Sequence, residues 1–298
     1  MPMPSPVPAP APALAPRPVD PAGASPADPA PGAGTLARPD GTLAYEVAGG
    51  GPLVVLLPGL GQLRSAYRHL VPELTARGFR TVALDLRGHG ASSVGWPAYG
   101  AEAMGPDVAA LIEHLGGPAL LVGNSYGAGP AVWAAAERPD LVAGVVLTGP
   151  FVRTQRTPWL LRAAMRVLFA GPWRVAAWDA FTNGLLKAGR PDDQDAERAR
   201  LGASLREPGR FAALAAMLAR DDAPIEARLG RVRAPALVLM GTADPDFPDP
   251  MAEARAVADA MGGRAEPLDG VGHYPHLEVP GAMAERLAVF AQDAFGRG

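Results

Sequence analysis

The sequence predicts an α/β protein, built on a doubly wound, mostly parallel sheet into which a block of helices is inserted. Short apolar runs alternate with amphipathic stretches along most of the chain, as strands and their crossover helices do in a parallel sheet. Several of these runs are apolar at every position, which is typical of strands buried on both faces. Residues 151–223 break the alternation with helical stretches alone, and this block is too long for an ordinary connection.

Each run has a recognisable place in this plan. Residues 38–41, Arg-Pro-Asp-Gly, are a turn signal between two short strand-like pieces. The expected strands are residues 42–47, 53–57, 80–86, 119–123, 142–148, 235–240 and 265–268. The expected helices outside the block are residues 65–76, 104–115, 127–137, 251–261 and 281–295. Within the block, helices are expected at residues 159–169, 173–186 and 210–220.

The domain organisation follows from these elements. Residues 1–34 are rich in Pro and Ala and hold almost no large apolar side chains, so this tail is expected to be disordered. Residues 35–150 and 224–298 are expected to form the core, and residues 151–223 a helical cap. The tail has no basic residue before Arg17 and no continuous apolar run, unlike an export signal, so a cytoplasmic location is expected.

Composition excludes several classes of function. The chain has 298 residues, 48% hydrophobic and 19% charged, which is enough apolar material for a large core. The net charge is −3 with both signs scattered, so no basic face for nucleic acid is expected. Cysteine is absent, which removes disulfides, thiolate metal sites and a cysteine nucleophile. No apolar run reaches 18 residues, so no membrane insertion is expected. The sequence carries no feature that predicts the oligomeric state.

The strongest chemical signal is Gly123-Asn124-Ser125-Tyr126-Gly127. It follows an apolar strand and opens a helical stretch, the context in which a G-x-S-x-G turn exposes a nucleophilic serine. The flanking glycines permit close backbone approach, and the helix N-terminus favours developing negative charge. We therefore predict that Ser125 is a nucleophile; the alternative is a purely structural turn.

A serine nucleophile needs a base, and the chain has five histidines. His273 is favoured because it lies in the loop between the last strand and the last helix, where a sheet of this kind carries catalytic groups. His276 shares that loop and is the alternative. His69 and His114 lie on expected helices with polar neighbours, and His89 lies in a loop after the strand 80–86.

The third member of such a site is a carboxylate that follows another strand, between the serine and the histidine in the chain. Asp244, which follows the strand 235–240, fits this position and is predicted to orient the imidazole of His273. Asp246 and Asp249 are close enough to be alternatives, although a turn residue and a helix N-cap are the expected roles for them.

An oxyanion hole requires two backbone donors. We predict the N–H of Tyr126, directly after the serine, and the N–H of Leu60, in the loop after the strand 53–57. A structural turn is the alternative for that loop. A dinucleotide-binding interpretation of Gly59-x-Gly61 is weaker, because Arg64 stands where a third glycine belongs.

With these residues the sequence resembles the α/β-hydrolase superfamily, especially its cap-bearing members related to esterases, haloperoxidase-like proteins and carbon–carbon bond hydrolases. The matching segments are residues 57–61, 85–92, 123–127, 241–244 and 272–273. The resemblance implies a structural role for the loop that contains His89. A serine in place of an aspartate nucleophile argues against dehalogenase and epoxide hydrolase chemistry. Pro58 stands where the family often has histidine, which alters the loop that shapes the oxyanion hole.

The expected function is hydrolysis of an ester, thioester or lactone of a small, apolar substrate through an acyl-enzyme, without metal or cofactor. Carbon–carbon bond hydrolysis of a diketone-type substrate is one alternative. Asn124 resembles the serine turn of those enzymes, whereas Tyr274 stands where they often carry Trp. A non-catalytic binding protein is another. Trp159 and Trp178 are predicted to line the substrate pocket, or else to pack the cap onto the core.

Overall fold

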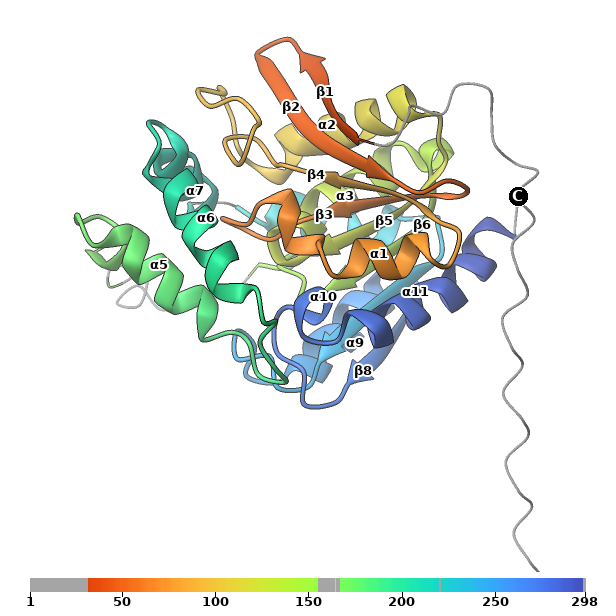
Figure 1. The fold of residues 1–298 in the computed structure, drawn as a ribbon. Helices are drawn as coiled ribbons and strands as arrows, with labels where there is room; N and C mark the ends of the chain where they lie inside the picture. Colours follow the sequence, from red (N-terminus) through yellow and green to blue (C-terminus); the bar gives the residue numbers. More distant parts are fainter. Residues whose placement is uncertain (1–31, 155–163, 165–166, 220, 297–298) are drawn as a thin grey trace, which may run out of the picture.

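One eight-stranded sheet runs through the computed structural model, in the order β1-β2-β4-β3-β5-β6-β7-β8 (Figure 1). The structure describes residues 32–154, 164, 167–219 and 221–296. Antiparallel pairing joins β1 to β2 and β2 to β4, and every other pair is parallel. The strands are β1 (Gly32–Arg38), β2 (Gly41–Ala48), β3 (Leu53–Leu57), β4 (Arg80–Leu84), β5 (Ala119–Asn124), β6 (Val142–Thr148), β7 (Ala236–Gly241) and β8 (Arg264–Leu268).

The continuous apolar runs are strands with two buried faces. In β3, Leu53, Val55 and Leu57 belong to one core cluster, whereas Val54 and Leu56 belong to another on the opposite face. This split follows from the two-residue period of a strand. The first cluster is covered by α2 (Ala101–Leu115), α3 (Ala128–Glu137) and α9 (Pro250–Ala260), and the second by α1 (Leu70–Thr75) and α11 (Pro280–Phe295). The predicted α/β class with a doubly wound sheet is confirmed.

A run of helices separates β6 from β7. Its described elements are α5 (Arg174–Asn183), α6 (Gln194–Arg206), α7 (Arg210–Leu218) and α8 (Ala223–Glu226). Trp178, Leu205 and Leu214 belong to a separate small core formed by α5, α6 and α7. These three helices gather at one end of the sheet (Figure 1). That end carries the loops after the parallel strands, because Gly88 after β4 lies against Ala213 of α7.

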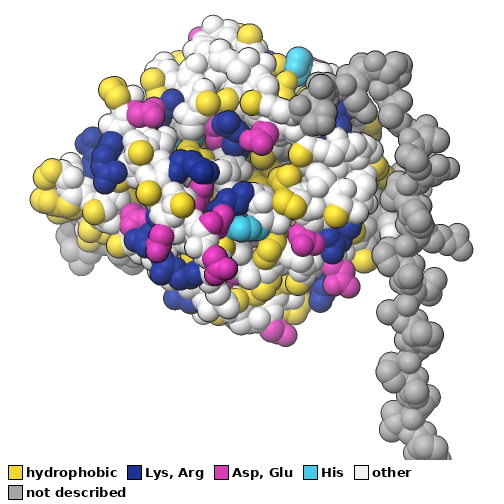
Figure 2. Space-filling view, in the orientation of Figure 1, with side chains coloured by type: hydrophobic (Ala, Val, Ile, Leu, Met, Phe, Trp, Pro, Cys, Tyr) yellow, Lys and Arg dark blue, Asp and Glu magenta, His cyan; other side chains and the backbone are white. Residues whose placement is uncertain are grey.

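Short segments complete the chain. They are the 3-10 turns η2 (Arg64–Tyr67), η3 (Ser125–Gly127), η4 (Pro139–Leu141) and η5 (Leu229–Arg231), and the helix α10 (Pro275–Glu278). None of the described helices combines the length and apolar character that a bilayer crossing requires. Figure 2 shows acidic and basic side chains interspersed on the face in view, as the small net charge leads one to expect.

Some expected boundaries were wrong. Residues 32–34 are not part of the tail, because they begin β1 and pair with β2 from Val47 to Tyr45. Composition alone could not reveal that Gly34 leaves room for the ring of Tyr45. The helix expected over residues 65–76 is instead η2 followed by α1. Pro72 has no N–H to donate and fits only the first turn of a helix, so α1 begins at Leu70. Residues 1–31 and most of 159–169 lie outside the described residues.

A buried ion pair fixes the loop after β4 against α2. Arg87 donates from Nε to Asp107 Oδ2 at 2.6 Å, and Arg38 donates to Asp107 Oδ1 at 2.9 Å. We expect Asp107→Ala to lower the free energy of unfolding by about 3–5 kcal/mol, because it leaves the buried Arg87 without its carboxylate. Urea denaturation measures this. Asp140→Ala removes an exposed partner of Arg138 and is the matched control; an equal loss in both variants would contradict the prediction.

Candidate active site

Ser125 occupies a strained turn between β5 and α3. Its φ of 53° lies in the left-handed region, which no other described non-glycine residue adopts. The turn is tight on both sides: a Cβ at Gly123 would come 2.7 Å from the oxygen of Gly127, and one at Gly127 would come 2.3 Å from the oxygen of Leu57. Both positions therefore require glycine, and the strain is of the kind that active sites retain.

His273 and Asp244 form a buried pair in the loops after β8 and β7. The distance from His273 Nδ1 to Asp244 Oδ2 is 2.7 Å, and both side chains are 1% exposed. Burial by itself lowers the pKa of His273. The hydrogen bond to Asp244 and the charges of Asp244, Asp246 and Glu278 outweigh burial and hold the pKa above the usual 6.5. Gly149 lets the chain pass beside the pair, because a Cβ there would come 2.7 Å from the imidazole.

Hydrogen bonds join the histidine loop to the serine turn. Asn124, directly before the serine, donates from Nδ2 to the carbonyl oxygen of His273 at 3.0 Å and to Thr148 Oγ1 at 3.0 Å. Asn124 is completely buried. It therefore connects the ends of β5 and β6 to the histidine loop at the carboxyl edge of the sheet, and this role accounts for its amide nitrogen.

Glu278 was not identified from the sequence, although it organises the histidine loop. Its carboxylate accepts the N–H of Gly272 at 3.0 Å and of Tyr274 at 3.1 Å, on either side of His273. It also accepts the N–H groups of Lys187 and Ala188, both at 2.7 Å, in the segment after α5. One carboxylate thus links the histidine loop to the inserted helices, and an acidic residue in a short helix gives no sequence signal for this.

The other two aspartates after β7 differ in what they face. Asp249 caps α9 by accepting the N–H of Ala252 at 2.9 Å, as its N-cap interpretation predicted. The N–H of Asp246 donates to Asp244 Oδ1 at 3.0 Å and closes a turn. Its carboxylate, however, lies 3.6 Å from His273 Nε2, on the side of the ring opposite Asp244. The expectation that Asp246 is a turn residue therefore holds for its backbone but did not describe its carboxylate.

The remaining histidines lie away from Asp244. His276 is completely buried and packs on Tyr67 with ring centroids 4.7 Å apart, and burial lowers its pKa to about 3. His89 is buried and bonds to the carbonyl oxygen of Arg87 at 3.0 Å. His69 lies 2.9 Å from Asp193 and His114 lies 3.0 Å from the hydroxyl of Tyr45, both with solvent access. Of the five, His273 is the one that pairs with Asp244.

The loop after β3 lies directly beside Ser125. Gln62 closes it, because its Oε1 accepts the N–H of Gly59 at 3.1 Å while its own N–H donates to the oxygen of Gly59 at 3.1 Å. A Cβ at Gly59 would lie 3.2 Å from that of Ser125. The loop thus presents Leu60 next to the serine turn, where the second oxyanion donor is predicted.

Aromatic side chains surround this centre. Phe151 and Phe247 stack with ring centroids 5.1 Å apart, and they lie 6.0 and 6.4 Å from the ring of His273. Trp178 is 2% exposed, packs on Phe169, and places Nε1 against Gly61. Of the two interpretations of Trp178, the structure shows the packing of this side chain, and its contact with a substrate stays a prediction. Trp159 lies outside the described residues.

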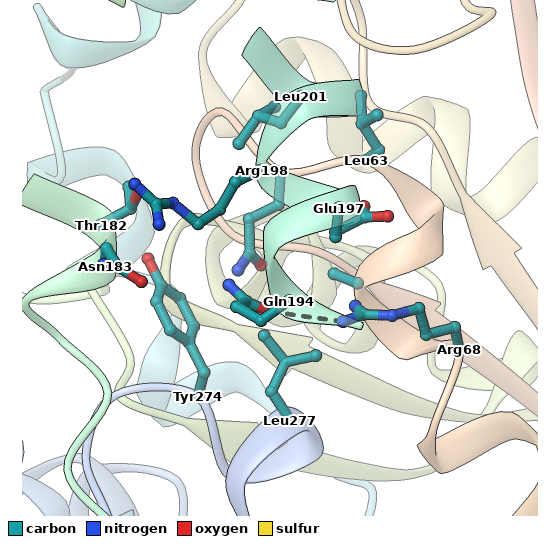
Figure 3. A pocket seen from close by; sticks show the side chains of 12 residues that line it. Leu63, Arg68, Thr182, Asn183, Gln194, Glu197, Arg198, Leu201, Tyr274 and Leu277 are labelled. Carbon is teal, nitrogen blue, oxygen red and sulfur yellow. Dashed lines mark hydrogen bonds between the residues drawn. The ribbon is translucent and has the colours of Figure 1, made fainter. Parts of the chain in front are cut away.

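A small pocket adjoins the centre between α6, the end of α5 and the histidine loop (Figure 3). Tyr274 connects the pocket to the centre, because it lines the pocket and its ring lies 5.0 Å from that of His273, whereas Gln62 brings in the loop after β3. The guanidinium groups of Arg68 and Arg198 lie at its edge and are bonded to Asp193 and Asp179. Leu63, Leu201 and Leu277 also line the pocket, so its wall combines apolar side chains with amides, a phenol and paired charges.

Asp244, Asp246 and His273 are the described group whose side-chain atoms could meet around a cation, all within 4.8 Å of one another. The 2.7 Å contact between Asp244 and His273 Nδ1 is a direct hydrogen bond. Asp244 and His273 are thus joined directly, and a role for them in proton transfer stays a prediction.

The fold and the centre define an α/β protein with a serine on a strained strand-to-helix turn and a buried His-Asp pair at the same edge of the sheet. Residues 54–286 match the model of the alpha/beta hydrolase family, and the chain belongs to this family. The resemblance that was stated from the sequence is confirmed.

Three relatives illustrate the range of the family. The chain is 39% identical over 117 residues to 2-(acetamidomethylene)succinate hydrolase of Mesorhizobium japonicum; the match covers 38% of this chain and 42% of that protein, less than half of its length. It is 31% identical to a protein assigned as the non-heme bromoperoxidase BpoC of Mycobacterium tuberculosis, over 83% of this chain and 97% of that one. The structure of esterase RhEst1 from Rhodococcus sp. ECU1013 is similar with a TM-score of 0.73 at 26% identity, covering 86% and 96% of the two chains.

Proposed function

We propose that the protein is a serine hydrolase that cleaves an ester, thioester or lactone of a small molecule through an acyl-enzyme. One observation carries the proposal: Ser125 lies in a left-handed turn, tied through Asn124 to a loop whose His273 pairs with Asp244 at 2.7 Å. Membership in the alpha/beta hydrolase family supports it, and so do relatives named as hydrolase and esterase.

In the proposed reaction, Ser125 Oγ bonds to the substrate carbonyl carbon while its proton passes to His273 Nε2. The carbonyl electron pair moves to oxygen, and the N–H groups of Leu60 and Tyr126 stabilise this oxyanion. His273 then gives the proton to the leaving group, and an acyl-enzyme forms. Water, deprotonated by His273, releases the acid by the same steps in reverse order.

The substrate class is inferred from the surroundings of His273. The stacked rings of Phe151 and Phe247 beside the imidazole favour an apolar group next to the scissile bond. The pocket of Figure 3 is lined by leucine side chains as well as by amides and a phenol, so a largely apolar group with a few polar atoms fits it best. We propose that α5, α6 and α7 act as a cap whose contacts decide which substrates fit.

A fluorophosphonate probe tests the nucleophile. We expect the probe to modify the wild-type chain at Ser125 alone, because this serine combines an adjacent base with oxyanion donors. Mass spectrometry of the labelled peptides identifies the site. A label elsewhere, with Ser125 unmodified, would overturn the assignment.

A substrate panel then resolves the reaction class. Turnover of p-nitrophenyl butyrate, a butyryl thioester or a simple lactone supports the proposal. Cleavage of a vinylogous 1,5-diketone without ester cleavage would replace it with carbon–carbon bond hydrolysis. Stoichiometric binding with neither labelling nor turnover would indicate a binding protein.

A further inference from the structure

His273 has a carboxylate on each side of its ring. Asp244 bonds to Nδ1 at 2.7 Å, and Asp246 Oδ2 lies 3.6 Å from Nε2. The proposed mechanism uses Asp244 but gives no role to Asp246. A separation of 3.6 Å is longer than a hydrogen bond but short enough for a strong charge interaction, so Nε2 stays available to Ser125.

The backbone fixes this arrangement. The N–H of Asp246 donates to Asp244 Oδ1 at 3.0 Å, so the two carboxylates are held at a set spacing by one turn. The side chain of Asp246 is 17% exposed, which places its charge at the rim of the site and partly shielded from water. Asp246 is therefore positioned by the same turn that positions the orienting acid.

Among the described residues, the carboxylates around the ring of His273 all favour its protonated form. Asp244 and Asp246 face it from the loop after β7, and Glu278 acts on it from α10. Tyr274 is buried beside these acids and its pKa is raised, so it remains neutral. His276 of α10 is neutral as well, with a pKa of about 3. The imidazolium form of His273 is thus favoured by three carboxylates.

We propose that Asp246 is a positioning residue that stabilises the imidazolium of His273 from its Nε2 side, where the ring exchanges protons with Ser125 and the leaving group. The inference rests on the proposed function. The proton that leaves Ser125 makes the ring a cation for the lifetime of the tetrahedral intermediate, and Asp246 is the acid nearest to that nitrogen.

The consequence is a trade-off across pH. Attack by Ser125 requires neutral His273, so the charge of Asp246 moves the acid limb of activity to higher pH. The same charge stabilises the cation that forms once attack begins, so it raises the rate where the ring is neutral at rest. Loss of Asp246 is expected to improve relative activity at acid pH and lower it at alkaline pH, so that the two profiles cross.

The first measurement needs no substrate. The chain is labelled with ¹⁵N-histidine for NMR. The ring signals of His273 are assigned as those that disappear from the spectrum of the His273→Gln variant. We expect His273 to titrate above pH 6.5 in the wild type and about one pH unit lower in Asp246→Asn. Asp249→Asn, three residues along the same loop, should leave the midpoint of the His273 titration at its wild-type pH. Asp246→Glu, which keeps the negative charge, should also give a midpoint close to that of the wild type. Should Asp246→Asn fail to fold, Asp246→Ser takes its place.

An unchanged His273 midpoint in the folded Asp246 variant overturns the proposal. The second measurement is kcat/KM for p-nitrophenyl butyrate from pH 5 to 9, where crossing profiles are expected and a fall of about three- to tenfold on the alkaline side. A uniform loss at every pH would mark Asp246 as merely structural. If the midpoint shifts while no ester is cleaved, the proposed function fails and the action of Asp246 on the ring stands.

Discussion

Replacement of Ser125 by Ala is expected to reduce kcat on an activated ester by about 10³-fold or more, because nucleophile, base and acid act as one unit. The rate that remains comes from the oxyanion donors and from binding. The KM should change little, since only one oxygen atom is removed from a site that otherwise keeps its shape. Single-turnover kinetics with p-nitrophenyl butyrate should show that the burst of acyl-enzyme formation is lost. Retention of more than a tenth of the wild-type rate would contradict this role.

Two further variants separate chemistry from folding. Ser204→Ala makes the same atomic change on α6 and should keep wild-type activity. Ser125→Gly should be as inactive as Ser125→Ala but more stable to urea by about 1 kcal/mol, because glycine adopts a φ of 53° without steric cost. A glycine variant that is less stable than the alanine variant would show that the turn is not strained by its side chain.

The sheet was predictable because its strands are local signals. The run at β3 is apolar at every position, and the run at β6 is interrupted only by Gly144 and ends on Thr148, so the expected bounds of both strands agreed with the structure. The strand over residues 80–86 ends two residues early, at Leu84. The next residue, Asp85, accepts the N–H of Ala91 at 2.9 Å and thus starts the loop. Such a contact depends on the fold of the loop, which periodicity does not describe.

For the candidate centre, the sequence selected residues but could not describe what surrounds them. Glycine spacing, loop placement and chain order were enough to select Ser125, His273 and Asp244, and the structure brings the last two into contact. The orientation of Asp246 depends on which way one turn directs a side chain. The clamp by Glu278 joins segments 91 residues apart, and no local pattern encodes such a distance.

The inserted helices were the least predictable part. Helix α6 was not predicted from the sequence, because it has few apolar residues. It contacts its neighbours through ion pairs such as Arg198 with Asp179. Its position becomes clear from contacts with the core, where Arg68 bonds to Asp193 at 2.7 Å just before the helix begins. Charges that find their partners only after folding leave no periodic signal in the sequence.

Asp244→Asn is expected to lower kcat by about 10³- to 10⁴-fold while the chain keeps its fold. Asp244 Oδ1 accepts the N–H of Asp246 at 3.0 Å, and Oδ2 contacts His273 Nδ1. Asparagine keeps its one oxygen for the N–H of Asp246, so its amide nitrogen must face Nδ1. Nδ1 then becomes an acceptor, the proton moves to Nε2, and the ring can no longer take the proton of Ser125.

This prediction has a signature besides the loss of rate. In the ¹⁵N spectrum of the neutral ring, the proton on His273 should move from Nδ1 in the wild type to Nε2 in Asp244→Asn. Asp249→Asn changes an acid of the same loop that only caps α9, and it should alter neither the tautomer nor kcat. An Asp244→Asn variant that keeps both the wild-type tautomer and most of its activity would mean that another group orients the imidazole. Asp246, on the far side of the ring, would then be the first residue to replace in the same background, because it is the other carboxylate within 4 Å of a ring nitrogen among the residues that the structure describes.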